Sequence, residues 1–236
     1  RQSTPALAVY RAALTATVFW GRTPAMTKFV VAEVDPFTVG ILRTVVAGLI
    51  CLVVALVIGL SLPKTASAWL LMGFSVSRCY IGFPVLFTLG QAETTTSHVA
   101  LIIAIMPVLM GLFAALTELR MPVRGWWIGS STAFLGVAFL VGAWFGFGGS
   151  DDSLDGDLLC LAAAICGSAG YIAGSRLTSE IGTWATTFWG LTIAGLFGGA
   201  AFMFGPDQTY WSTISGFGYA TLLYLAICGS ILGYVI

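Results

Sequence analysis

The sequence predicts an all-α integral membrane protein, and three observations point to that fold class. Hydrophobic residues make up 58% of the chain, charged residues make up only 8%, and the mean hydropathy is +0.96. A soluble domain carries charge on about a quarter of its residues, so this chain lacks the polar surface that water would require. Its apolar runs also lack the alternating polarity of barrel strands, which favours helices.

The apolar residues gather into eight segments, separated by short connections that hold proline, glycine and charged residues. Each segment has about twenty residues or more, the length that a helix needs to cross about 30 Å of hydrocarbon. We therefore expect eight membrane-spanning helices in this chain. Their approximate limits are 5–31, 36–61, 66–90, 93–117, 125–146, 155–175, 183–204 and 215–236.

The loop charges predict the direction in which the chain crosses the membrane. With a cytoplasmic N-terminus, the basic loop residues lie inside, and the outer connections hold acids but no Lys or Arg. The inside residues are Arg1, Lys64, Arg120, Arg124 and Arg176, and the outside acids are Glu33, Asp35, Asp151, Asp152 and Asp207. This pattern predicts a multi-pass protein of the cell (inner) membrane whose N-terminus is cytoplasmic.

Two parts of the chain share a weak pattern. Trp20 lies eight residues before Lys28, and Ser168 lies eight residues before Arg176, with each basic residue near a helix end. The segment 145–157 is rich in glycine and aspartate and separates the two parts. We therefore expect a first repeat of five helices over 1–147 and a second, incomplete repeat over 148–236.

The third and eighth helices extend this correspondence, because residues 79–83 line up with residues 230–234. Repeats with an odd number of helices are inverted relative to each other, as in many alternating-access transporters. The third helix is then expected to pack beside the eighth, near a pseudo-twofold axis. By the same register the chain stops inside its eighth helix, so the whole bundle is expected to contain ten helices, two of them beyond these residues.

At this level of detail the sequence resembles the EamA-type families of the drug/metabolite transporter superfamily. The likeness covers most of residues 15–140. The residues that carry it are Trp20-Gly21 with Lys28, Pro36, Arg43 with Ala47, Pro107, Leu116-Thr117-Glu118, and Gly129 with Gly136. The second half departs from the family pattern, because Ser168 stands where a Trp is common and no proline follows Arg176. The resemblance implies two inverted five-helix repeats and the export of amino acids or similar metabolites.

Polar side chains inside the hydrocarbon region are expensive, so they are the first candidates for function. Arg78 is at the centre of the third helix and is expected to bind substrate in a cavity. Arg22, in the first helix, is a second candidate. Arg43 is expected to snorkel or to pair with helix-end carbonyls. His98 is either a packing histidine beside two threonines or a cavity residue.

The aromatic residues that could line a cavity are Trp20, Tyr80, Tyr171, Trp184 and Trp189. Trp20 and Tyr80 are the central ones and are favoured, and Tyr171 is a further candidate, whereas Trp184 and Trp189 are also compatible with a membrane interface. A rocking transporter also needs places where its helices bend. Glycine and proline weaken a helix at such places. The predicted hinge residues are Gly21, Pro24, Gly82 and Pro84.

The acids suggest the charge of the cargo. Asp and Glu occur only in loops or near the ends of the predicted helices, whereas arginines lie deeper. A proton-driven exporter of cationic drugs needs a buried carboxylate, so that class loses support. A guanidinium offers paired hydrogen bonds to a carboxylate, which favours a carboxylate substrate.

These observations predict a secondary transporter that exports amino acids or related carboxylates by alternating access. A sugar-phosphate or nucleotide-sugar antiporter is the alternative in the same class, and a non-transporting membrane scaffold is the alternative outside it. The sequence has no ATP-binding GxxxxGK[ST] run, and one histidine, His98, with no HExxH-like sequence pattern is a poor basis for an enzyme.

The expected partners are a small-molecule substrate and the lipid bilayer, in a monomer or a weak dimer. Ten basic and ten acidic residues cancel, which gives no sign of a nucleic-acid partner. The five cysteines lie in apolar runs without metal-binding spacing, so we expect no metal and no cofactor.

Overall fold

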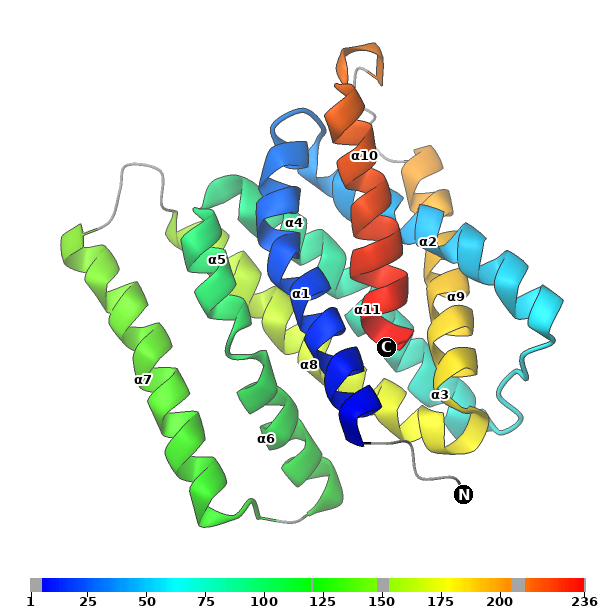
Figure 1. Cartoon of the computed structure of the whole chain (residues 1–236), viewed down its shortest axis with the longest axis horizontal. Helices are drawn as coiled ribbons and strands as arrows, with labels where there is room; N and C mark the ends of the chain where they lie inside the picture. The colour runs from blue at the N-terminus through cyan, green and yellow to red at the C-terminus, as the bar shows by residue number, and fades with distance from the viewer. Residues whose placement is uncertain (1–5, 120, 148–152, 205–210, 236) are drawn as a thin grey trace.

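A computed structural model describes residues 6–119, 121–147, 153–204 and 211–235, and the regular structure in these ranges is helical (Figure 1). The prediction of an all-α membrane protein is confirmed. The elements are α1 (Ala6–Val31), α2 (Pro36–Ile58), α3 (Ala66–Ser75), η1 (Val76–Gly82), α4 (Phe83–Glu93), α5 (Thr96–Ile103), α6 (Met106–Glu118), α7 (Arg124–Phe147), α8 (Leu154–Ile181), α9 (Thr183–Phe204), η2 (Trp211–Thr213), α10 (Gly216–Tyr224), η3 (Leu225–Leu232) and α11 (Gly233–Val235).

These elements form the eight predicted spans. The third span consists of α3, η1 and α4, the fourth of α5 and α6, and the eighth of α10, η3 and α11. Among the described residues, five spans are long and apolar enough to cross a membrane, judged by length and composition alone. They are Pro36–Ile58, Ala66–Glu93, Thr96–Glu118, Leu154–Ile181 and Thr183–Met203. Five loop charges used for the orientation, Arg1, Arg120, Asp151, Asp152 and Asp207, lie outside the described residues, as does most of the connection between α7 and α8.

Two spans differ from their expected form. The fourth is interrupted after Ile103, and Pro107 occupies the first turn of α6, where a missing N–H costs little. The sixth, α8, continues to Ile181, so Arg176 lies within a helix instead of a loop. The Arg176 Nη2 donates to the carbonyl oxygen of Thr117 at 2.8 Å, which satisfies a carbonyl near the end of α6.

Local signals explain where the helices begin and end. The Asp35 carboxylate accepts from the amide of Thr38 at 2.8 Å, and Pro36 starts α2. Gly59 ends the same helix with φ of 68°, a conformation that glycine adopts without strain. Thr65 caps α3 in the same way as Asp35 caps α2, by accepting from the amide of Ala68 at 3.1 Å.

The most extensive contact between two described helices joins α2 and α9. Gly48 and Gly195 face each other there at equivalent distances from the starts of their helices. A Cβ atom on Gly48 would lie 2.6 Å from the Leu191 carbonyl oxygen and 2.8 Å from the Gly195 Cα. Small residues let the two backbones approach, which is how helices associate where lipid removes the hydrophobic driving force. We call this contact the α2–α9 seam.

The order of elements supports the predicted repeats. The series α1, α2 and third span is followed later by α8, α9 and eighth span, and both three-part spans contain a π-helical segment, η1 in one and η3 in the other. The predicted contact between the third and eighth spans is also present, because the Cys79 Sγ and the Tyr234 hydroxyl lie 3.4 Å apart. The division at residue 147 remains a prediction.

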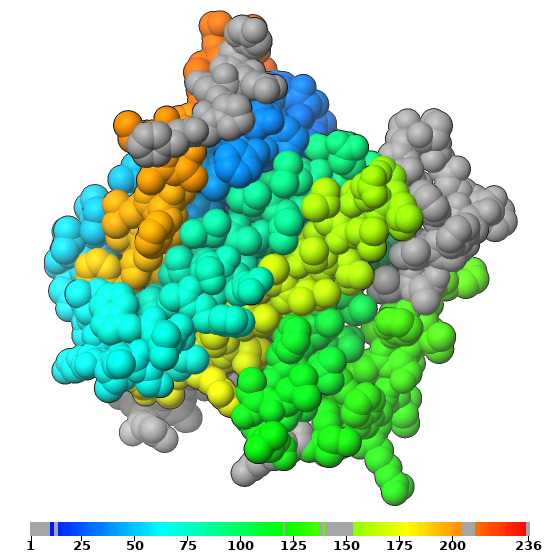
Figure 2. Space-filling view, turned by 180° about the vertical axis from the view of Figure 1, so that it is seen from behind, coloured from blue at the N-terminus to red at the C-terminus, as the bar shows by residue number. Residues whose placement is uncertain are grey.

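Figures 1 and 2 show how the spans surround the centre. In Figure 1, α1 and the eighth span lie in front, whereas Figure 2 shows the opposite face, where the third span runs beside α8. One end of the bundle holds the last residues of α1 and α4 and the first residues of α8. This end is at the top of Figure 1, and we call it the upper end. The helices α6 and α7 form one edge of the bundle.

Candidate functional site

The two π-helical segments provide backbone carbonyl groups that accept hydrogen bonds from side chains of other helices. The Tyr80 carbonyl in η1 accepts from the Thr44 hydroxyl of α2 at 3.2 Å. The Gly229 carbonyl in η3 accepts from the Trp20 indole N–H of α1 at 3.2 Å. Such i→i+5 segments are rare inside helices and concentrate at functional sites, which marks this region as the candidate site.

A row of three aromatic rings crosses the centre and joins α1, α11 and η1. The Trp20 and Tyr234 centroids are 5.6 Å apart, those of Tyr234 and Tyr80 are 5.2 Å apart, and both pairs meet edge to face. Tyr80 is buried, whereas Trp20 is 39% exposed. The row therefore runs from an exposed end at Trp20 to a closed end at Tyr80, where Gly190 of α9 leaves room for the ring.

Arg43 is the buried arginine of this region. Its side chain extends from α2 toward η3, and the residue is only 3% exposed. The Nε and Nη2 groups both donate to the Ser230 hydroxyl, at 3.3 and 3.2 Å, and that hydroxyl donates onward to the Leu225 carbonyl at 3.1 Å. The Nη1 group has no hydrogen-bond partner within the described part of the chain, and no ion pair of Arg43 occurs there.

This geometry corrects one sequence-based expectation. We expected Arg43 to snorkel or to pair with helix-end carbonyls, but it points inward and bonds to a serine of another span. A sequence cannot reveal this, because depth along a helix does not say which face a residue occupies. The family pattern that pairs Arg43 with Ala47 was the one available signal, since both residues prove to be buried in α2.

Arg78 has different surroundings. It lies in the middle of the third span as predicted, but it is exposed, and within the described residues its Nη1 has one hydrogen-bond partner, the Cys166 sulfur at 3.9 Å. Its guanidinium carbon also lies 5.7 Å from the centre of the Phe74 ring. No described contact links Arg78 to the aromatic row.

The other predicted binding residues fall into two groups. Trp20 and Tyr80 come together through Tyr234, whereas Tyr171 is 40% exposed on α8. Arg22 is exposed on α1, and His98 lies at the upper end, away from the row. Two of the predicted aromatic residues are thus assembled, whereas the predicted arginines and His98 lie apart.

His98 is not isolated, contrary to expectation. Its Nδ1 lies 3.0 Å from a carboxylate oxygen of Asp157, which sits in the first turn of α8. The other oxygen of that carboxylate accepts from the Thr94 hydroxyl at 2.7 Å. Sequence reasoning treated Asp157 as part of a linker. It did not predict the contact with His98, because the two residues are far apart in the chain.

The predicted hinges lie in two settings. Gly82 ends η1 and Pro84 starts α4, directly beside the candidate site. A Cβ on Gly82 would lie 3.0 Å from the Ser77 carbonyl oxygen, so a larger residue would disturb the π-helical turn. Gly21 and Pro24, by contrast, lie in α1, which runs on past both without interruption.

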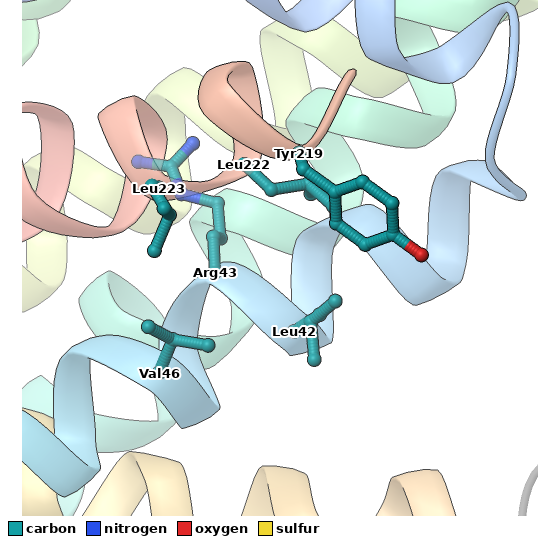
Figure 3. A pocket seen from close by; sticks show the side chains of 6 residues that line it. All are labelled: Leu42, Arg43, Val46, Tyr219, Leu222 and Leu223. Atoms are coloured by element: carbon teal, nitrogen blue, oxygen red, sulfur yellow. The ribbon is translucent and has the colours of Figure 1, made fainter. Parts of the chain in front are cut away.

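An apolar cavity of about 200 Å³ lies beside Arg43, between α2 and α10 (Figure 3). Its walls come from Leu42, Val46, Leu222 and Leu223, together with the stem of Arg43 and the ring of Tyr219. Figure 3 shows the Arg43 guanidinium passing this cavity toward the eighth span. The cavity therefore contacts the hydrocarbon part of the side chain.

The arrangement is suited to holding an anion by hydrogen bonds. Among the described residues, no group of three or more His, Cys, Asp or Glu side chains is placed to hold a metal ion. A guanidinium with one free N–H group, a neighbouring hydroxyl and aromatic rings can instead bind a carboxylate beside an apolar or aromatic group. Ser230 and Tyr234, which the sequence did not single out, were already aligned with residues of the third span.

Comparison with known proteins agrees with this fold. The model of the EamA-like transporter family matches residues 8–142, more than half of the chain. The uncharacterized transporter YdeK of Bacillus subtilis (strain 168) is 28% identical over 225 residues, which cover 92% of this chain and 74% of that protein. A crystal structure with 18% identity has the same fold, with a TM-score of 0.66 over 95% of this chain and 76% of the other. The chain is therefore a multi-pass membrane transporter that belongs to the EamA-like transporter family.

Proposed function

We propose that this protein exports amino acids or related small carboxylates by alternating access, and that Arg43 binds the carboxylate. The observation that carries the proposal is the buried Arg43 guanidinium, whose Nη1 has no hydrogen-bond partner in the described structure. Its two other donors share one hydroxyl oxygen, that of Ser230. A bound carboxylate would supply the missing acceptor.

The cost of burying Arg43 argues for a function. An arginine inside the hydrocarbon region is expensive, and the cost reaches about 2.5 to 3.5 kcal/mol at a helix centre on the lenient insertion scale. A structural arginine would recover this cost through a full set of acceptors, but the described partner of Arg43 is a single neutral hydroxyl. An unsatisfied N–H that faces a site of transport is well placed to be satisfied by the substrate.

The aromatic row supports an amino-acid-like cargo. Tyr234 joins Trp20 to Tyr80 near Ser230, so the rings lie next to the proposed carboxylate position. Aromatic faces attract ammonium groups and also stack on apolar side chains. A sugar phosphate would use the same arginine, but the rings offer few hydrogen bonds to its hydroxyl groups.

The α2–α9 seam and the π-helical segments suggest how the site could change access. The seam is tightly packed through Gly48 and Gly195 and would stay closed. The irregular segments η1 and η3 lie where neighbouring spans must move relative to it. Gly82 ends η1 and Pro84 lies just after it in the first turn of α4, so these two remain the best-placed hinge candidates.

No ATP-binding run occurs in the sequence, so we infer that gradients drive transport. Export of a substrate with one negative charge from a negative-inside cell gains about 2.3 kcal/mol per 100 mV, whereas a zwitterion gains nothing from the potential. The proposed location is the inner membrane with a cytoplasmic N-terminus, which places Lys64 inside and Glu33 outside. Labelling of single cysteines at these two positions from the same side would contradict that orientation.

The test is exchange transport in liposomes with a panel of amino acids, aromatic carboxylates and sugar phosphates. We expect Arg43→Gln to lower exchange of the best substrate by at least about tenfold, the loss of one charged hydrogen bond. Arg43→Lys keeps the charge but loses the paired geometry, so it should be intermediate. The exposed Arg22→Gln serves as the matched control and should behave as wild type.

Folded yield separates binding from structure in the same preparations. Replacing an incompletely paired buried charge by a neutral amide should leave folding intact or improve it. A purely structural Arg43 predicts instead that folded protein and transport disappear together. Normal exchange by a well-folded Arg43→Gln protein would rule out the proposed binding site.

A further inference from the structure

A second polar cluster lies at the upper end of the bundle, apart from the aromatic row. Its centre is Asp157, whose side chain is 7% exposed, and its two carboxylate oxygens contact the Thr94 hydroxyl and the His98 Nδ1 at 2.7 and 3.0 Å. His98 has an 11% exposed side chain. Asp157 also lies near the N-terminus of α8, where the helix dipole favours a negative charge.

This cluster joins four helices. Thr94 ends α4, and its carbonyl accepts from the Lys28 ammonium group of α1 at 2.9 Å. Thr95 starts α5, where its hydroxyl accepts from the amide of His98 at 3.5 Å. Asp157 belongs to the proposed second repeat, whereas the other members belong to the first. The contact between His98 and Asp157 therefore crosses the two parts that alternating access would move.

The helices that pack around His98 and Asp157 carry other titratable groups. Lys28 approaches from α1, Glu93 ends α4 on the exposed side, and Asp155 and Cys160 lie on α8 itself. The sequence of α7 has no titratable side chain after Arg124, at its other end. Among these groups, histidine is the one whose ordinary titration falls between pH 5 and 8.

We propose that His98 and Asp157 form a proton-binding pair that fastens α5 to α8 at the upper end. A neutral imidazole donates one hydrogen bond to the carboxylate, and protonation adds the attraction of opposite charges at the same short distance. Thr94 keeps the second carboxylate oxygen satisfied in both states. The upper end then opens less readily in acid than at neutral pH. This inference goes beyond the transport proposal, and its test requires no substrate.

The experiment is hydrogen–deuterium exchange on the full chain in lipid nanodiscs, at about pH 5.5 and about pH 8, on either side of histidine titration. Exchange is corrected for its intrinsic dependence on pH. Peptides that cover 94–103 and 153–162 should be several-fold more protected in acid, whereas peptides from α2 should not change. In His98→Asn, an amide N–H stands in the place of the imidazole Nδ1–H but cannot take up the proton, so the difference should vanish.

Two further variants keep the test decisive. Asp157→Asn removes the charge that attracts the imidazolium, so it should also lose the pH response, even if His98→Asn folds poorly. The matched control is Glu33→Gln, because the Glu33 carboxylate makes a separate contact at this end, accepting from the amide and hydroxyl of Ser215 at 2.9 Å each. It should keep the wild-type response. A wild-type protein without the pH difference, or a His98→Asn protein that retains it, would overturn the proposal.

Discussion

The first three spans and the last three follow the same order of helices, but they carry different residues at matching positions. Arg43 lies as far from the start of α2 as Gly190 lies from the start of α9. Arg43 reaches across to Ser230 in the eighth span, whereas Gly190 has no side chain and leaves room for the Tyr80 ring of the third span. One side of the α2–α9 seam therefore holds a cation and the other side an aromatic ring.

A second pair of matching positions also has arginine in one half and glycine in the other. The register that aligns residues 79–83 with 230–234 also pairs Arg78 with Gly229. A Cβ on Gly229 would lie 3.4 Å from the Arg43 Nη2, so the glycine of one half makes room for the arginine of the other. Two halves with similar backbones can therefore build an asymmetric site. At each of these matching positions one half has an arginine and the other a glycine, and this choice decides where the charge lies.

The largest effect is expected from Gly48→Leu, which disrupts the α2–α9 seam to which both halves contribute. The new side chain would meet the backbone of α9 at Leu191 and Gly195, and backbone cannot move aside as a side chain can. We expect most of the folded protein to be lost, as measured by monodisperse yield in size-exclusion chromatography. Gly199→Leu on α9 is the matched control, because nothing lies within 4 Å of its Cβ position. Equal yields for the two variants would contradict a closed seam.

A smaller effect is expected from Gly190→Ala, which makes the second half more like the first. The added methyl group would lie 2.5 Å from the Tyr80 Cε2 atom, and overpacking of this kind costs about 1 to 3 kcal/mol. The thermal midpoint in detergent should fall, and exchange of aromatic substrates should weaken because Tyr80 is displaced. Gly199→Ala should leave both quantities unchanged. If Gly190→Ala keeps the wild-type midpoint, Tyr80 is less tightly held than its burial indicates.

The smallest effect is expected from Arg78→Gln. The described contacts of Arg78 are a long one to the Cys166 sulfur and one to the Phe74 ring, and neither joins it to the aromatic row. Exchange in liposomes should therefore stay close to that of wild type. A folded Arg78→Gln protein without transport would reverse the comparison and return the substrate site to Arg78, where sequence depth alone predicts it.

Local patterns were sufficient to predict the spans. The limits predicted for the first, second and seventh helices lie within a few residues of the structure, because Pro36, Gly59 and similar signals act on the backbone beside them. The π-helical form of η1 and η3 was not predictable. It depends on partners from other spans, such as the Trp20 indole that bonds to the Gly229 carbonyl.

The sequence by itself determined that this chain is a helical membrane protein, because apolar length is a property of consecutive residues, and its motifs carried the resemblance to a transporter family. It also placed Trp20 and Tyr80 in the same site, through central positions in their helices. Only the tertiary structure decided that Arg43 is buried whereas Arg78 is exposed, and that His98 meets Asp157. The physical reason is that a position along a helix sets depth in the membrane, whereas the packing of neighbouring helices sets which face is buried.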